Sequence, residues 1–410
     1  MMPGKGEPPK VGVLYDAGSA GPVEIFAACR GLCEPVFIRN GAEGARLGRS
    51  ALDITGLGPD AAAAAVRAAG IGHLITFSER QLMATAEIAE RTGIGFLSSD
   101  TALLCQDKAA QRRALADRGV DMTRTRALRD PGDLADALTE IGLPAVIKPR
   151  QGMSSAYTVR VDTLSEAREW LKGWVARSPG TVRELVVEEM LQGDSGQAGP
   201  EWGDYVSVES IVDGAEVHHV CVTGKFPLAE PFRETGLVYP STIDAALHAR
   251  VCDLAGAAVR ALGIDRGATH TEVKLTAEGP RIIEVNGRLG GYIADSLRHA
   301  AGFDLIAAAI RSALGLPLDR SVPEPRQVGY KYQFQPPRTA SRVTEMRGAE
   351  TLEQIPGVRR FELSSPPGSP VDWSRGSGGH VGIIHGEAAD HDGVLAAIQA
   401  ATTALEITYE

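Results

Sequence analysis

The stretch RIIEVNGRLGG, from Arg281 to Gly291, places a carboxylate, an amide and a guanidinium at alternate positions before a glycine pair. Residues two apart on a β-strand share a face, so Glu284 and Asn286 are expected to point the same way. A turn at Glu278-Gly279-Pro280 would fold this strand back on the preceding one. That antiparallel pairing would bring Glu272 opposite Glu284.

These oxygen-bearing side chains predict a metal site. Two carboxylates and an amide oxygen on one sheet face would repel each other unless a cation lay between them. Hard oxygen ligands suit Mg²⁺ or Mn²⁺, which keep water ligands and bind substrate phosphates. We therefore predict that Glu272, Glu284 and Asn286 hold metal, and the alternative is a solvated sheet face.

A short glycine- and serine-containing loop is a candidate phosphate site. Lys148 ends an apolar strand, and Gly152, Ser154 and Ser155 follow in the turn to the next strand. Glycine permits close approach of the backbone, and N–H groups and hydroxyls can hold phosphate oxygens. The loop lacks the Walker spacing. An ordinary hairpin is the alternative, and the neighbouring lysine favours the phosphate interpretation.

Composition limits the class of protein. The 410 residues are too many for one compact core and predict about two to four domains. The net charge of −10 argues against a nucleic-acid surface. No apolar run is long enough to span a bilayer, and the N-terminal MMPGKGEPPK has no apolar signal core. The five scattered cysteines fit buried small hydrophobes in a reducing compartment. We expect a cytoplasmic protein.

The alternation of apolar strands and helices at the N-terminus predicts a small parallel sheet. Strands are expected at 11–15, 35–39 and 73–77, with helices between them. The sequence pattern changes near Asp107, which is a reasonable N-cap for a helix that ends at Gly119. A long helical stretch is expected over 294–315, and the tail is rich in β-strand patterns. The chain is therefore expected to be α/β with the divisions 1–105, 106–185, 186–322 and 323–410.

Six motifs follow one another along the chain. They are Asp107-Lys108, Val146-Ile147-Lys148-Pro149, the Gly/Ser loop, Val187-Glu188-Glu189-Met190-Leu191, His270-Thr271-Glu272 and Glu284-Val285-Asn286-Gly287-Arg288. In this order they resemble the ATP-grasp superfamily, and most of all its carboxylate–amine ligases, including the L-amino-acid ligases that make dipeptides. The resemblance covers roughly residues 72–318. It implies a Rossmann-like N-terminal domain, two ATP-grasp subdomains and a small β-rich C-terminal domain.

The resemblance implies roles for the matching positions. Lys108 and Lys148 would contact the phosphates of ATP, and Arg288 would stabilise an oxyanion. Glu272, Glu284 and Asn286 would hold two Mg²⁺ ions. The nucleotide would also meet the Gly/Ser loop and a hinge strand, and the substrate would lie near the residues after Arg288. The hinge would comprise Glu188, Glu189, Met190 and Leu191, and the substrate side would comprise Glu234, Arg288, Gly290, Gly291 and Tyr292.

One segment departs from the family pattern. In KFPLAEPFRETGLVYPS (225–241), Leu237 stands where the family commonly has histidine, which puts in doubt any substrate contact carried over from that histidine. Glu234 and Arg233 are candidates for binding the amino end of a substrate. An exposed salt-bridged pair is an equally good interpretation of these two residues.

These expectations lead to three hypotheses. The first is an ADP-forming ligase that joins an amino acid to an amine, such as a second amino acid, through an acyl phosphate. The second is an ATP-grasp ligase or carboxylase acting on a carboxylate outside amino-acid metabolism. The third is a non-catalytic ATP-binding module, which the intact set of Glu272, Glu284, Asn286 and Arg288 argues against. Neither nucleic acid nor membrane is expected as a partner, and a homodimer is left open.

Overall fold

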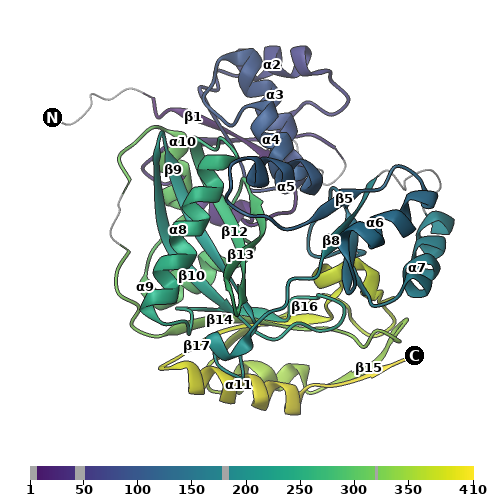
Figure 1. Ribbon diagram of the computed structural model, residues 1–410. Coiled ribbons are helices and arrows are strands. Elements are labelled where there is room, and N and C mark those ends of the chain that lie inside the picture. The colour runs from purple at the N-terminus through teal and green to yellow at the C-terminus, as the bar shows by residue number, and fades with distance from the viewer. Residues whose placement is uncertain (1–6, 42–50, 178–183, 319–321) are drawn as a thin grey trace.

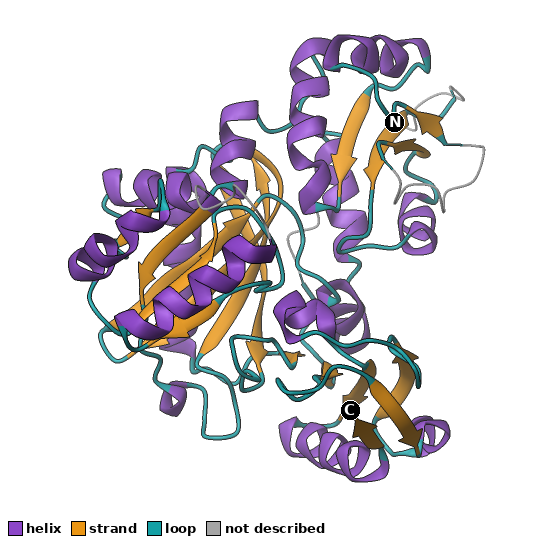
Figure 2. Cartoon of the chain, turned by 90° about the vertical axis from the view of Figure 1, so that its right-hand side faces the viewer, coloured by secondary structure: helices purple, strands orange, loops and turns teal. Residues whose placement is uncertain are grey.

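The computed structural model describes residues 7–41, 51–177, 184–318 and 322–410, and it has the predicted mixed α/β architecture (Figure 1). The first six residues, on which the expectation of no secretory signal partly rests, lie outside the described part. Within the described ranges, no helix combines the length and the apolar character needed to cross a bilayer. The N-terminal sheet and the C-terminal strands lie at opposite ends of the molecule in both views (Figure 1 and Figure 2).

The N-terminal part forms the expected parallel sheet, with the strand order β3-β2-β1-β4. Alternate residues of β1 face opposite sides, so Val11 and Val13 pack with α1 while Leu14 packs with α2 and α3. The elements are β1 (Lys10–Tyr15), α1 (Pro22–Cys29), β2 (Glu34–Arg39), β3 (Leu52–Asp53), α2 (Pro59–Ala68), β4 (His73–Thr76), the 3₁₀ turn η2 (Glu79–Gln81), α3 (Leu82–Thr92) and α4 (Ser99–Gln106).

A separate antiparallel sheet follows, with the order β5-β8-β6-β7. The helix α5 precedes it, and Asp107 caps α5 as predicted by accepting from the N–H groups of Ala109 and Ala110. The small sheet packs its apolar face against α6 and α7, with Trp174 in the core. The elements are α5 (Lys108–Asp117), β5 (Thr125–Ala127), α6 (Leu134–Ile141), β6 (Ala145–Pro149), β7 (Val159–Val161), α7 (Leu164–Arg177) and β8 (Leu185–Glu189).

The largest sheet has the order β13-β12-β9-β10-β11-β14-β17-β16. Helix α8 packs on one face, and α9 and α10 pack on the other, so the central strand β9 is buried along almost its whole length. The elements before the predicted boundary at 322/323 are β9 (Tyr205–Asp213), β10 (Glu216–Lys225), β11 (Gly236–Tyr239), α8 (Ala245–Ala261), β12 (Arg266–Thr276), β13 (Gly279–Asn286), α9 (Ile293–Ala301) and α10 (Leu305–Ala313).

The helical structure expected over 294–315 is present and is divided into two helices, α9 and α10. Helix α9 ends at Gly302, whose φ of +70° is the left-handed conformation that glycine adopts readily. Asp304 then caps α10 by accepting from the N–H of Ala307. The sequence carried both signals, a glycine stop and an aspartate cap, inside the apolar periodicity.

The C-terminal strands extend the large sheet. Strand β14 pairs with β11, and β17 and β16 follow it outward. The strands on the two sides of the predicted boundary at 322/323 thus share one sheet, and the boundary itself stays a prediction. The elements are β14 (Val328–Phe334), β15 (Val343–Arg347), β16 (Val358–Leu363), the 3₁₀ segment η7 (Trp373–Gly379), β17 (Gly382–Ala388), α11 (His391–Ala404) and β18 (Glu406–Tyr409).

Candidate active site

A cavity of about 390 Å³ lies between the small sheet, the β12–β13 hairpin and the C-terminal strands. Asn286 and Gly290 are buried within the same hairpin and the turn that follows it. The structure thus brings the predicted residues to one place, while their individual roles stay predictions. The predicted residues that line the cavity are Lys108, Lys148, Gly152, Ser154, Ser155, Glu188, Glu189, Met190, Leu191, Glu234, Glu272, Glu284, Arg288, Gly291 and Tyr292.

The hairpin has the predicted register. Glu272 lies directly opposite Glu284, and His270 lies opposite Asn286. The Oε1 atom of Glu284 is 3.0 Å from the Nζ atom of Lys108, and the Oε1 atom of Glu272 is 3.3 Å from His270 Nε2. Cross-strand neighbours of this kind have side chains close enough to share a ligand.

The predicted ligands suit a metal ion whose coordination shell is completed by the substrate. Within the described residues, no group of three or more His, Cys, Asp or Glu side chains could hold an ion by itself. Two facing carboxylates with an amide oxygen nearby are what Mg²⁺ needs when water and phosphate supply the remaining ligands. Glu272, Glu284 and Asn286 therefore fit a magnesium–nucleotide site.

A buried acid that the sequence interpretation missed positions this hairpin. Glu209 on β9 is fully buried, makes a short hydrogen bond with His270 Nδ1 and accepts from the N–H of Gly290 at 2.9 Å. Burial alone would lower the pKa of His270, but the charges of Glu209 and Glu272 and their hydrogen bonds raise it to about 9. His270 is therefore a cation at neutral pH, held between two carboxylates.

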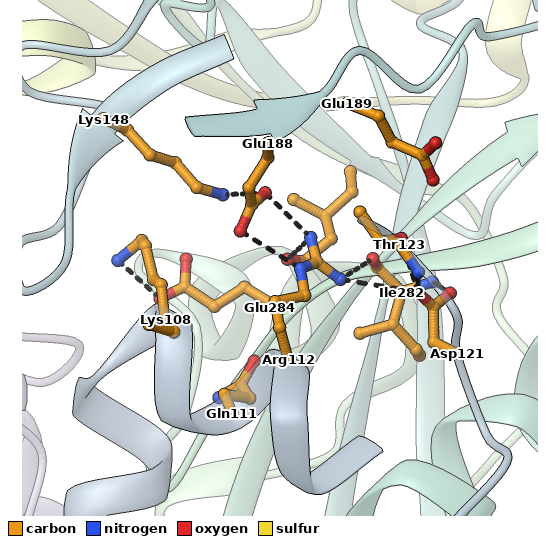
Figure 3. Close-up of polar contacts among 12 residues, drawn as sticks. Lys108, Gln111, Arg112, Asp121, Thr123, Lys148, Glu188, Glu189, Ile282 and Glu284 are labelled. Carbon is orange, nitrogen blue, oxygen red and sulfur yellow. Dashed lines mark hydrogen bonds and ion pairs between the residues drawn. The ribbon is translucent and has the colours of Figure 1, made fainter. Parts of the chain in front are cut away.

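Lys148 belongs to a buried ionic network shown in Figure 3. Its Nζ atom is 2.7 Å from Glu188 Oε2, and the guanidinium of Arg112 contacts both oxygens of Glu188 at 3.2 Å. Burial would raise the pKa of Glu188, but the charges of Arg112 and Lys148 outweigh it and lower the pKa to about 2. Glu189, next on the strand, contacts Arg124 and Arg281 instead.

Helix α5 covers the open edge of the large sheet. The sheet ends at β13, and an edge strand leaves backbone groups unpaired. Arg112 donates to the carbonyls of Ile282 and Ile283 at 2.6 and 2.8 Å, while the amide of Gln111 both donates to and accepts from Val285. Arg112 thus links the β12–β13 hairpin to the acid beside Lys148 (Figure 3).

The Gly/Ser loop is docked on the C-terminal part of the chain. Ser154 and Ser155 have φ values of +57° and +55°, which non-glycine residues seldom adopt. The carbonyl of Ser154 accepts from the N–H of Ser377 at 2.7 Å, and the N–H of Tyr157 donates to Ser374 at 2.8 Å. Lys108 Nζ donates to the carbonyl of Gly152 at 3.1 Å and contacts Glu284, so the loop lies between the β12–β13 hairpin and η7.

Arg288 reaches back to the N-terminal part. Its Nε atom is 3.2 Å from Oε2 of Glu79, which follows the N-terminal sheet. Burial raises the pKa of Glu79, although the charge of Arg288 opposes that shift. The Nη2 atom of Arg288 also donates to Oδ1 of Asn286 at 3.3 Å. Glu79 was missed because the sequence gives no signal that positions 79 and 288 meet.

Glu234 has two cationic neighbours. Its carboxylate oxygens are 3.6 Å from Lys225 Nζ and 3.4 Å from Lys331 Nζ. Arg233 is buried and donates to the carbonyls of Glu230 and Pro336, both at 2.7 Å. The alternative of an exposed Arg233–Glu234 pair was therefore wrong.

Comparison with known proteins agrees with this geometry. The ATP-grasp domain family matches residues 141–295, and the L-amino acid ligase C-terminal domain 2 family matches residues 333–410. The alanine–anticapsin ligase of Bacillus subtilis (strain 168) is 28% identical over 58% of this chain and 52% of its own length. The uncharacterized protein y4rH of Sinorhizobium fredii is 30% identical over 65% of this chain and 53% of its own. The chain thus spans about half the length of these curated relatives.

Solved structures show the same fold. The L-amino acid ligase from Bacillus licheniformis superimposes with a TM-score of 0.78 at 21% identity, over 99% of this chain and 100% of that one. Carboxyaminoimidazole ribonucleotide synthase from Aspergillus clavatus, complexed with ATP, has a TM-score of 0.74 at 19% identity, over 97% and 98% of the two chains. With the family matches and the predicted motifs gathered in one cavity, the chain contains an ATP-grasp domain, followed by a C-terminal domain 2 of the L-amino acid ligase type.

Proposed function

We propose that this protein is an ADP-forming ligase that joins a carboxylate, as in an amino acid, to an amine, as in a second amino acid. The observation that carries the proposal is the cavity itself. Its walls combine two facing carboxylates, lysines from two elements and Arg288. The C-terminal domain 2 of L-amino acid ligases and the alanine–anticapsin ligase relative support the amino-acid substrates.

We propose ATP and Mg²⁺ as the cofactors, with two magnesium ions held by Glu272, Glu284 and Asn286, and Mn²⁺ as a substitute. Bound metal would offset negative charge on the phosphate oxygens. Lys108 and Lys148 approach from α5 and β6 and would add positive charge at the phosphates. The hinge residues Glu188 to Leu191 would hold the adenosine end.

The proposed reaction has two steps. A carboxylate oxygen of the substrate attacks the γ-phosphorus of ATP, the bond to the β-phosphate oxygen breaks, and ADP leaves. The nitrogen of the amine then attacks the acyl carbon, the amine loses a proton, and phosphate leaves with the electrons of the C–O bond. Arg288 would stabilise the oxyanion of the tetrahedral intermediate, and Gly290 and Gly291 would offer N–H groups to it. Tyr292, the next residue in the chain, would line the substrate side of the cavity.

We further propose that residues 106–185 close over the cavity as a lid and keep water from the acyl phosphate. The other divisions would be 1–105, 186–322 and 323–410. The docking of the Gly/Ser loop on η7 supports a site that is completed by the C-terminal part. The cytoplasmic location stays an expectation.

The second candidate is a ligase or carboxylase for a carboxylate outside amino-acid metabolism. The similarity to carboxyaminoimidazole ribonucleotide synthase favours it, because that protein shares the fold over nearly its whole length. A substrate screen separates the two functions, since one requires amino acids and the other does not.

The test is product analysis with pairs of amino acids, Mg²⁺ and ATP. We expect ADP and phosphate to form only when both substrates are present. Replacing Arg288 with alanine should lower turnover about 10²–10³-fold with little change in ATP binding, because its charge matters where the oxyanion develops. Arg113→Ala, an exposed arginine on α5, is the matched control. AMP and pyrophosphate as products would refute the acyl-phosphate reaction.

A further inference from the structure

Two lysines that the proposed reaction does not use lie at the substrate end of the cavity, and Lys331 is the one that lines it. Lys225, Leu237 and Lys331 are aligned in register across β10, β11 and β14. Residues paired in this way project from the same face of a sheet. Leu237 occupies the middle of this row, so a hydrocarbon side chain stands between two lysines.

The lysines are incompletely paired. Within the part of the chain that the structure describes, Glu234 is the one acidic side chain within 4.0 Å of either ammonium group. Its contacts with them, at 3.6 and 3.4 Å, are longer than the roughly 2.7–2.9 Å of a close charge-assisted hydrogen bond. One carboxylate thus contacts two ammonium groups, and neither lysine has a carboxylate of its own within ion-pair distance among the described residues.

One of the two lysines, Lys331, is buried at the cavity wall. Lys331 lines the cavity although only 3% of its surface is exposed, and its Nζ atom lies 4.5 Å from the centre of the Tyr292 ring. A buried ammonium group without a full counter-charge is costly, so its retention points to an anion that arrives with a ligand. Tyr292 follows Gly290 and Gly291, so the charge is near the proposed acyl-transfer centre.

A buried polar group with an unpaired acceptor among the described residues lies on the same strand. Gln333 is two residues after Lys331 on β14 and shares its face. It also lines the cavity and is 5% exposed, and its Oε1 atom has no hydrogen-bond partner among the described residues. Buried polar atoms in native proteins are seldom left unpaired, so this acceptor also points to a polar ligand.

We propose that Lys331 and Gln333 form a subsite for a second, non-reacting carboxylate of the substrates. Lys331 binds the carboxylate, and Gln333 accepts a hydrogen bond from a neighbouring N–H or O–H group of the same substrate. The inference rests on the proposed ligase function and deepens it, because it requires a substrate with a carboxylate besides the one that is activated. That group is either the α-carboxylate of the amine substrate or a side-chain carboxylate of the acyl substrate.

The test compares substrates that differ in one charge. ADP release is measured with amino acids and their α-carboxamides as amine substrates, and with aspartate and glutamate against asparagine and glutamine as acyl substrates. We expect the wild-type protein to have about a 10- to 100-fold lower KM for the carboxylate form in one of the two comparisons, as for a charged hydrogen bond. The comparison that shows the difference identifies the source of the carboxylate.

In Lys331→Met, this KM ratio should fall to near one while the KM for ATP is unchanged. Lys331→Arg should keep the preference for the carboxylate, and Lys172→Met, at an exposed position of α7, is the control. If Lys331→Met does not fold, Gln333→Leu tests the same subsite and should raise the KM of the preferred substrate. An unchanged ratio in a folded Met variant, with ADP still formed, overturns this inference alone. No ADP with any pair overturns the proposed function and this inference with it.

Discussion

The buried network around Glu188 makes a quantitative prediction for the variant Glu188→Gln. The carboxylate is 3% exposed and lies 2.7 Å from Lys148 and 3.2 Å from Arg112. Its pKa falls from the ordinary 4.5 to about 2, which corresponds to about 3 kcal/mol of the free energy of unfolding at neutral pH. Removing one partner of a buried ion pair costs about 3–5 kcal/mol, so the two magnitudes agree.

Glu188→Gln should therefore lower the free energy of unfolding by about 3 kcal/mol at pH 7. The stabilisation should be fully present above pH 4.5 and should disappear as the pH falls toward 2, because the folded state lowers the pKa of Glu188. Chemical unfolding at pH 7 and pH 3 measures both effects. Glu189→Gln is the matched control, and we expect it to cost about 1 kcal/mol or less, because Arg124, one of its two partners, is largely exposed.

The double variant Lys148→Met/Glu188→Gln decides whether the charges act together. Glu188→Gln alone leaves Lys148 buried without its carboxylate, and the second substitution removes that uncompensated charge. We expect the double variant to lose less stability than the sum of the two single variants, by about 1 kcal/mol or more. Strictly additive losses would refute the view that Glu188 stabilises the protein through Lys148.

Three further predictions concern the cavity. Glu284→Gln removes the partner of Lys108 and, on the proposed function, a metal ligand, so ADP formation should fall at least about 100-fold and its dependence on Mg²⁺ should weaken, as a magnesium titration would show. Gly376→Ala should raise the KM for ATP, because the new Cβ atom would lie 2.0 Å from the carbonyl oxygen of Ser154 and the φ of +64° disfavours alanine. An unchanged KM for ATP would show that η7 has no part in nucleotide binding. The pKa of His270 is raised from 6.5 to about 9, so its contribution to stability should be complete below pH 6.5 and lost as the pH rises through 9. Unfolding curves of the wild type and His270→Gln at pH 7 and 9.5 test this. The same change of unfolding free energy with pH in both proteins would contradict it.

Local patterns predicted the parts of the site that depend on neighbouring residues. The period of two along a strand and the turn at Gly279-Pro280 were enough to place Glu272 opposite Glu284. Asp107 was likewise recognisable as a cap, because its role involves only the next turn of chain. The sequence could not show that Glu79 meets Arg288, since that contact joins segments far apart in the chain and depends on how they pack.

The pairing of strands in the large sheet was also hard to predict, because it joins segments far apart in the chain. The tail was correctly predicted to be rich in β-strand, but pairing of β14 with β11 depends on contacts between segments far apart in the chain. Glu209 left a usable signal, an acid within the otherwise apolar and small-residue strand YVSVESIVD. An ionisable group in a strand buried on both faces needs a partner, and its presence could have indicated a charged neighbour such as His270.

The cost of these buried charges is itself an argument for the site. Replacing a buried ion pair with apolar side chains of similar volume is often neutral or stabilising, so a fold that needed only stability has no reason to retain one. Yet Lys148, Glu188 and Lys331 are each less than 10% exposed, and all three line the same cavity. A concentration of ionic groups with perturbed pKa values around one cavity is the pattern of a binding or catalytic site. The physical chemistry of this cavity thus favours a charged ligand independently of any resemblance in sequence.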